Sequence, residues 1–209
     1  MRQRADLVFS LLEYERRLTA LRERMAVRGL DAVITTIPEN ICYLSGFESP
    51  GHYYFNALIV PLEGEPVAVP RQLEVSGYEE LTWLENIRFY TDTEDPIHKL
   101  YTTLVEFGLH YKRLGYEKNS WFFTAAQQDR LFAYCSPATF VDCSGLVEAG
   151  RLIKSEVEID LMRQAARTTE AGMRAGVEAV AAGVTENDIA AEIHYAMIKA
   201  GSEWPSIQP

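Results

Sequence analysis

The stretch Asn56-Ala-Leu-Ile-Val-Pro-Leu-Glu-Gly-Glu-Pro-Val-Ala-Val69 decides what kind of sheet the chain can form. Its first part, 56–62, is an apolar run of strand length, and its last part, 66–69, is a second apolar run. Between them, Glu63-Gly-Glu65 has the composition of a tight turn. We therefore predict an antiparallel hairpin at this point of the chain.

Helical and strand-like segments alternate on both sides of this hairpin. Upstream, Ser10-Leu-Leu-Glu13 is a capping-box pattern, and it predicts a helix that ends at Gly29. Downstream, Pro96 suits the first position of another helix. Such alternation is typical of an α/β domain, and the hairpin predicts that its sheet is mixed and flanked by helices. The other expected elements are strands at 30–36, 41–44, 87–90, 113–117 and 139–142, helices at 72–83, 96–107 and 122–132, and a turn at 38–40.

The pattern changes near Gly150, after which the sequence is almost entirely helical. Ser155-Glu-Val-Glu158 and Thr185-Glu-Asn-Asp188 are both patterns that begin helices. Each helix carries an apolar stripe, but a helix pair alone has too little surface to bury. We therefore expect a first domain, 1–150, and an incomplete second domain, 151–209, whose helices need a sheet from a partner chain or from further polypeptide.

Composition and charge exclude several classes of protein. Hydrophobic residues make up 47% of the 209 residues and charged residues 24%, which is ordinary for a globular protein. The net charge of −10 gives no electrostatic support for binding nucleic acid. No apolar run approaches a membrane span, and the N-terminus lacks the apolar core of a signal peptide. We expect a cytoplasmic protein that binds neither nucleic acid nor membranes and keeps its three cysteines reduced.

Few residues suggest a binding site. There is no Gly-rich phosphate loop, GxSxG elbow or HExxH helix, and none of the four histidines has another His or Cys at metal-ligand spacing. His52, Tyr53 and Tyr54 gather in a loop with Gly and Pro, where such groups can line a substrate pocket or an interface. The alternative, favoured by the residues alone, is that Tyr53 and Phe55 pack inward while His52 and Tyr54 are solvated.

Other polar residues are expected at ordinary surface positions. Arg71 and Glu74 follow the hairpin, and they either bind a polar ligand or, as the default, pair with each other at the surface. His98 and His194 are expected to be surface histidines.

Three segments of the chain resemble the creatinase / aminopeptidase P / prolidase family, the M24 or pita-bread family. Asn40-Ile-Cys-Tyr-Leu-Ser-Gly-Phe47 is similar to its "N-I-x-Y-L-T/S-G-F" segment. Arg151-Leu-Ile-Lys-Ser-Glu-Val-Glu-Ile-Asp-Leu-Met-Arg-Gln-Ala-Ala166 is similar to its "R-x-I-K-S-x-x-E-I-x-x-M-R-x-A" entry into the catalytic domain. Gly183-Val-Thr-Glu-Asn-Asp-Ile-Ala190 is similar to its "G-x-T-E-x-D/E-I-A" helix start. The three segments stand in the family's order and span essentially the whole chain.

The resemblance implies a creatinase-type N-terminal domain followed by the first helices of a pita-bread α+β domain. It also implies a homodimeric, metal-dependent Xaa-Pro peptidase that acts on a peptide or small amide. In the peptidase members, two divalent ions (Mn, Co or Zn) are bound by two Asp, one His and two Glu and activate a water. No residue of this chain matches one of those ligands or a catalytic histidine. We therefore expect no metal bound by these 209 residues and no activity from them alone.

The resemblance leaves two alternatives open: a creatinase- or ectoine-hydrolase-like C–N hydrolase that works without metal, and a non-catalytic dimerisation module. Creatinase-like members place an arginine in the loop after a "Y-x-x-F" segment, where it reaches the substrate of the neighbouring subunit. The equivalent loop here, His52-Tyr-Tyr-Phe55, has no arginine, which argues against creatine as the substrate. The candidate substrate-binding residues are His52, Tyr53, Tyr54 and Arg71, supplied across a dimer.

Overall fold

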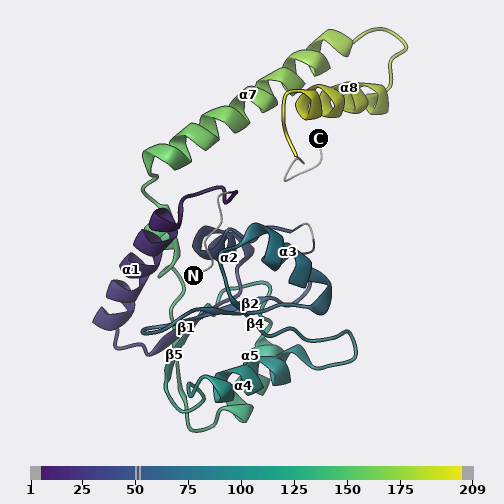
Figure 1. Cartoon of the computed structure of the whole chain (residues 1–209). Helices are drawn as coiled ribbons and strands as arrows, with labels where there is room; N and C mark the ends of the chain where they lie inside the picture. Colours follow the sequence, from purple (N-terminus) through teal and green to yellow (C-terminus); the bar gives the residue numbers. More distant parts are fainter. Residues whose placement is uncertain (1–5, 50, 52, 204–209) are drawn as a thin grey trace. The chain divides into compact units, whose positions relative to one another are not determined.

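The predicted hairpin lies within a six-stranded sheet in the computed structural model, which describes residues 6–49, 51 and 53–203 (Figure 1). The strand β2 runs antiparallel to both of its neighbours, whereas the other three strand pairs are parallel. The sheet is therefore mixed, as predicted, because the hairpin reverses one strand. In spatial order the strands are β4 (Asn86–Ile87), β3 (Val67–Val69), β2 (Ala57–Pro61), β1 (Ala32–Thr35), β5 (Arg113–Tyr116) and β6 (Thr139–Asp142).

This arrangement brings the carboxyl ends of five strands to the same edge of the sheet. Ala57, where β2 begins, pairs with Val69, where β3 ends. Leu58 pairs with Thr35, where β1 ends, and the parallel strands β5 and β6 end beside it. We call this edge the carboxyl edge. In open α/β sheets, ligands bind outside the carboxyl ends of the strands, so the loops at this edge are the first place to look for a site.

Helices cover both faces of the sheet (Figure 1). Side chains alternate along a strand, so Val33 of β1 packs into the core on one face and Ile34 into the core on the other. Because both faces are covered, the central strands are apolar on both sides. One face carries α1 (Leu11–Val27), α2 (Pro38–Ser45) and α3 (Val75–Leu81), and the other carries α4 (Pro96–Glu106) and α5 (Ala125–Tyr134).

The expected turn at 38–40 and strand at 41–44 are wrong, because the chain forms the helix α2 there. Pro38 occupies the start of the helix, where its fixed φ and missing N–H are tolerated. Ile41 and Leu44, three residues apart, both face the core. Gly46 ends the helix with a φ of 85°, a conformation that glycine adopts without strain.

Two other expected helices differ from the structure at their ends. Residues 72–83 form a 3₁₀ turn, Gln72–Glu74, followed by α3, and Thr82 is extended with a φ of −118°. The helix expected from residue 122 begins at Ala125, because Thr124 and Gln127 form a capping box there.

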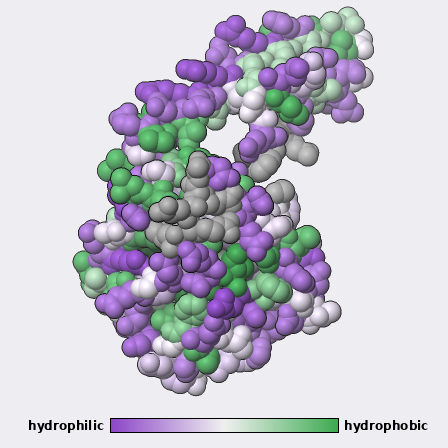
Figure 2. Space-filling model, in the orientation of Figure 1, coloured by the Kyte–Doolittle hydropathy of each residue, from purple (hydrophilic) through white to green (hydrophobic). Residues whose placement is uncertain are grey.

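The chain divides into two compact units, Met1–Ile153 and Lys154–Pro209. The second unit consists of α7 (Glu156–Ala179) and α8 (Glu186–Lys199), and both predicted capping boxes are formed, by Ser155 with Glu158 and by Thr185 with Asp188. The helices pack where α7 carries glycine, since a Cβ on Gly172 would lie 2.6 Å from Met197 Cγ. Hydrophobic side chains of this unit are also exposed, and Figure 2 shows green atoms at the surface over α7 and α8. They include Met162, Met173, Val177 and Ile198.

Candidate functional site

The loop and the arginine that the sequence singled out both lie at the carboxyl edge. Tyr53 and Tyr54 come just before β2 begins, and Arg71 comes just after β3 ends, so the antiparallel pairing places them at the same end of the hairpin. His52 lies outside the described residues.

Arg71 is held between an aromatic ring and a carboxylate. Its guanidinium carbon lies 4.0 Å from the centre of the Tyr54 ring. Its Nε and Nη2 atoms donate hydrogen bonds to the two oxygens of Asp92, at 2.5 Å and 2.7 Å. These bonds hold the pKa of Asp92 below its usual range, and the same carboxylate raises the pKa of Arg71. Arg71 therefore fixes the position of Tyr54 rather than presenting a free cation.

The expected surface pair of Arg71 with Glu74 is wrong. Arg71 forms an isolated β-bridge with Tyr90, and that bridge places Asp92, two residues later, within reach of the guanidinium. Glu74 instead lies against the backbone of Gly51, where a side chain would collide with its carboxylate.

The aromatic loop points partly inward and partly outward. Phe55 is buried as expected, with its ring centre 5.8 Å from that of Phe123, and its carbonyl accepts a hydrogen bond from Tyr90 Oη at 2.7 Å. Tyr53, which was expected to pack inward, is 82% exposed, because Phe55 is the residue before β2 that packs into the core. Tyr54 is 48% exposed. The loop therefore presents two tyrosines to its surroundings on an anchored backbone.

Other exposed apolar side chains follow strands that end at the carboxyl edge. Trp121, in the loop after β5, is 91% exposed, and Leu73, in the turn after β3, is 69% exposed. Single exposed apolar side chains are common on protein surfaces, so these two residues by themselves do not define a binding site.

A buried carboxylate at the same edge was missed by the sequence reasoning. Glu117 follows β5, is 1% exposed and accepts hydrogen bonds from Thr35 Oγ1 (2.6 Å), the Thr36 and Ile37 amides (2.7 and 2.9 Å) and Asn40 Nδ2 (2.6 Å). Burial raises the pKa of Glu117, and the four hydrogen bonds oppose that shift. The signal that could have found it is a glutamate directly after the apolar strand Leu-Gly-Tyr116.

The remaining candidates carry no chemistry of their own in the described part of the chain. His98 is exposed as expected, whereas His194 is half-buried rather than a surface residue. The cysteines are free, and burial raises the pKa of Cys135 to about 11 and of Cys143 to about 12, so neither is a reactive thiolate. Among the described residues, no three His, Cys, Asp or Glu side chains come together as metal ligands, so these residues do not fit a divalent ion.

Comparison with known proteins gives the family. The model of the Creatinase/Prolidase N-terminal domain matches residues 17–153, and the model of metallopeptidase family M24 matches residues 160–209. The chain belongs to the creatinase/prolidase family. It is 30% identical to the ectoine hydrolase of Halomonas elongata, over 98% of this chain and 56% of that protein. It is 35% identical to a creatinase of a Bacillus species, over 91% of this chain and 46% of that protein. The chain thus spans about half the length of the curated relatives it matches.

Solved structures of the family share the fold. The X-Pro aminopeptidase of Thermotoga maritima superposes with a TM-score of 0.74 at 23% identity, over 89% of this chain and 50% of that one. The prolidase of Pyrococcus horikoshii superposes with a TM-score of 0.72 at 20% identity, over 90% and 50%. At such identities the likeness establishes the fold alone.

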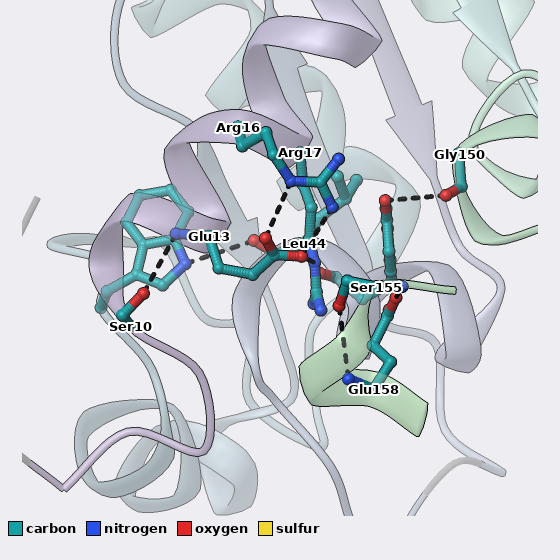
Figure 3. A network of polar contacts seen from close by, with 10 residues as sticks. Ser10, Glu13, Arg16, Arg17, Leu44, Gly150, Ser155 and Glu158 are labelled. Atoms are coloured by element: carbon teal, nitrogen blue, oxygen red, sulfur yellow. Dashed lines mark hydrogen bonds and ion pairs between the residues drawn. The ribbon is translucent and has the colours of Figure 1, made fainter. Parts of the chain in front are cut away.

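In this member of the creatinase/prolidase family, one hydrogen bond within the first unit joins two of the family-like segments, and a second reaches the residue just before the later segment. Asn40 Oδ1 accepts a hydrogen bond from Arg151 Nη1 at 2.8 Å, and Tyr43 Oη donates to the carbonyl of Gly150 at 2.9 Å. Arg17, from α1, donates to the carbonyl of Tyr43 and is paired with Glu13 (Figure 3). The resemblance in sequence therefore corresponds to physical contacts in the fold.

No described helix is both long enough and apolar enough to cross a membrane. The cytoplasmic location expected from the sequence stays a prediction.

Proposed function

We propose that this chain is part of a metal-dependent hydrolase that cleaves Xaa-Pro peptides, as the aminopeptidases P and prolidases do. The observation that carries the proposal is the match of the metallopeptidase M24 model to residues 160–209, directly after the N-terminal domain of the same family. Two divalent ions, Mn, Co or Zn, would then be bound outside the described residues and would activate the attacking water. The first domain would extend over 1–150 and the start of the catalytic domain over 151–209.

In this proposal the first unit supplies one wall of the substrate site to a partner subunit of a homodimer. Tyr53 and Tyr54 are exposed on an anchored loop, and the neighbouring His52 belongs to the same stretch of sequence. Arg71 supports the wall by fixing the ring of Tyr54, with its own charge neutralised by Asp92. The exposed side chain of Trp121 supports the presence of a partner surface near this edge.

A second candidate is hydrolysis of a C–N bond in a small amide or cyclic amidine without a metal. It is favoured by the identity of 30% to an ectoine hydrolase and 35% to a creatinase. The loop before β2 lacks the arginine that the creatinase-like members use, which argues against creatine itself. A third candidate is a non-catalytic dimerisation module.

One assay distinguishes the three candidates. The protein as it is produced in its own cells is purified and given an Xaa-Pro dipeptide, ectoine or creatine, with added Mn²⁺ or with a chelator. Cleavage of the dipeptide that the chelator abolishes supports the first proposal. Hydrolysis of ectoine that survives the chelator refutes it in favour of the second, and inactivity on all substrates with a dimeric mass favours the third.

The substrate wall has its own test in the same assay. The variant Tyr54→Ala is expected to raise KM about tenfold with little change in kcat, because the wall binds substrate without taking part in the bond cleavage. Tyr111→Ala, at an exposed tyrosine between α4 and β5, is the matched control. An unchanged KM in Tyr54→Ala would exclude the loop from the site.

A further inference from the structure

The helix α2 carries two side chains, one turn apart, that both hold the end of the first unit. Asn40 is fully buried and accepts a hydrogen bond from Arg151. Tyr43 is 9% exposed and donates a hydrogen bond to the carbonyl of Gly150. We call residues 146–151 the exit segment, because the first unit ends at Ile153.

The exit segment also lies close against α1. Arg24 Nε donates a hydrogen bond to the carbonyl of Leu146 at 3.0 Å. A Cβ placed on Gly150 would lie 2.9 Å from Arg24 Nη2 and 3.2 Å from Tyr43 Oη, which is tighter than ordinary van der Waals contact. The side chains of Arg24 and Tyr43 thus approach Gly150 closely, and the exit segment is held by side chains from two helices.

The other end of α2 is fixed by the carboxyl edge. Glu117 accepts hydrogen bonds from the backbone amides of Thr36 and Ile37, which would otherwise be unsatisfied at the start of the helix. Ile37 is the N-cap residue and offers no side-chain acceptor of its own. The helix therefore depends on a carboxylate that lies some eighty residues further along the chain.

Asn40 joins these two ends through one amide group. Its Nδ2 donates to Glu117 Oε1 at 2.6 Å, and its Oδ1 accepts from Arg151 Nη1 at 2.8 Å. The donor and the acceptor of the amide are thus both used, one toward the sheet and one toward the exit segment. A rotation of the amide or a shift of α2 would break both bonds together.

We infer that Asn40 and Tyr43 form a latch, through which the order of the exit segment depends on the position of α2 at the carboxyl edge. When Glu117 holds the start of α2, the latch is closed and residues 146–151 are fixed. When α2 is displaced, Arg151 and Gly150 lose their partners on it and the last part of the exit segment loosens, while Arg24 still holds Leu146. This inference concerns the first unit only and does not depend on the proposed function.

Hydrogen exchange read by mass spectrometry on the intact 209-residue chain tests the latch. The reporter amides are those of Ala149 and Gly150, which donate to the carbonyls of Gly145 and Val147. The variant Tyr43→Phe removes one hydroxyl and is expected to raise exchange in the exit segment about tenfold, as for the loss of one partly buried hydrogen bond. Tyr78→Phe, which removes a hydroxyl bonded to Asn56 on the same face of the sheet, is the matched control and is expected to leave the exit segment unchanged.

A second variant tests the dependence on the carboxyl edge. Glu117→Gln is expected to raise exchange at the start of α2 and in the exit segment together, because Asn40 links the Glu117 carboxylate to Arg151. The inference is overturned if Tyr43→Phe leaves the exit segment as protected as the unaltered chain. It is equally overturned if Glu117→Gln loosens α2 alone, or if Tyr78→Phe loosens the exit segment as much as Tyr43→Phe does.

Discussion

Replacing Glu117 by leucine is expected to destabilise the first unit by about 3 kcal/mol. The change keeps a side chain of similar size in a buried place but removes the acceptor for four hydrogen-bond donors. Thr35 can turn its hydroxyl elsewhere by side-chain rotation, whereas Asn40 can turn its amide only by giving up its bond to Arg151. The amides of Thr36 and Ile37 cannot, because they belong to the backbone at the start of α2.

The magnitude follows from those two amides. A buried donor without a partner costs about 1–3 kcal/mol, so two of them cost about 2–6 kcal/mol. Part of this free-energy cost is offset, because the variant no longer buries a carboxylate. The raised pKa of Glu117 shows that burial disfavours its charged form. A net loss of about 3 kcal/mol corresponds to a fall of about 10 °C in the melting temperature of a protein of this size.

Urea unfolding followed by tryptophan fluorescence measures the loss, and Trp83 supplies the part of the signal that depends on the fold around α2. Trp83 is fully buried, and its Nε1 atom donates to the carbonyl of Leu44 at the end of α2, so its emission reports on this region. Glu23→Leu, at an exposed position of α1, is the control for adding a leucine and should change the free energy of unfolding by less than about 0.5 kcal/mol. A loss below about 1 kcal/mol in Glu117→Leu would refute the account of α2 as a helix capped by a distant carboxylate.

Three further predictions concern charged groups. Burial raises the pKa of Glu117 above its usual 4.5, so the stability that this residue contributes is full below pH 4.5 and is lost as the pH rises through the raised pKa. The difference in unfolding free energy between the unaltered chain and Glu117→Leu should therefore narrow as the pH rises above 4.5, and a difference that widens contradicts this sign. The variant Asp92→Ala should free Arg71 from its carboxylate and speed hydrogen exchange at residues 53–56 several-fold, whereas Asp92→Glu should restore protection. The hydrogen bonds from Thr185 lower the pKa of Asp188 below 3.8. The cap of α8 should therefore be fully formed above pH 3.8 and be lost as the pH falls through the lowered pKa. A carboxyl titration of Asp188 by NMR with a midpoint above 3.8 would contradict this prediction.

The features that were predicted correctly from the sequence depend only on residues that are close together in the sequence. The hairpin required only two apolar runs and a glycine turn between them, and the capping boxes required only residues three positions apart. The helix α2 could not be predicted in this way. Its residues Ile41 to Leu44 are apolar and short enough for a strand, and the group that caps the helix, Glu117, is far away in the sequence.

The candidate site was predictable to the same limited extent. A loop rich in aromatic residues and an arginine after the hairpin were visible, and pairing of β2 with β3 does place them at one edge. The partner of Arg71 could not be predicted, because Asp92 comes close to Arg71 only through the β-bridge between Arg71 and Tyr90. The contact of Asn40 with Arg151 joins segments that lie more than a hundred residues apart in the sequence, and no local pattern predicts it.

The place of Leu146 and Val147 in the core has a consequence for how the chain is made. Both residues pack into the hydrophobic cluster that includes Leu18, Leu21 and Met25 of the first helix. That cluster therefore stays open on the ribosome until residue 147 has left the exit tunnel, although all six strands of the sheet precede it in the sequence. Since domains fold as units during synthesis, the nascent first unit cannot complete this part of its core until the segment after the last strand has emerged.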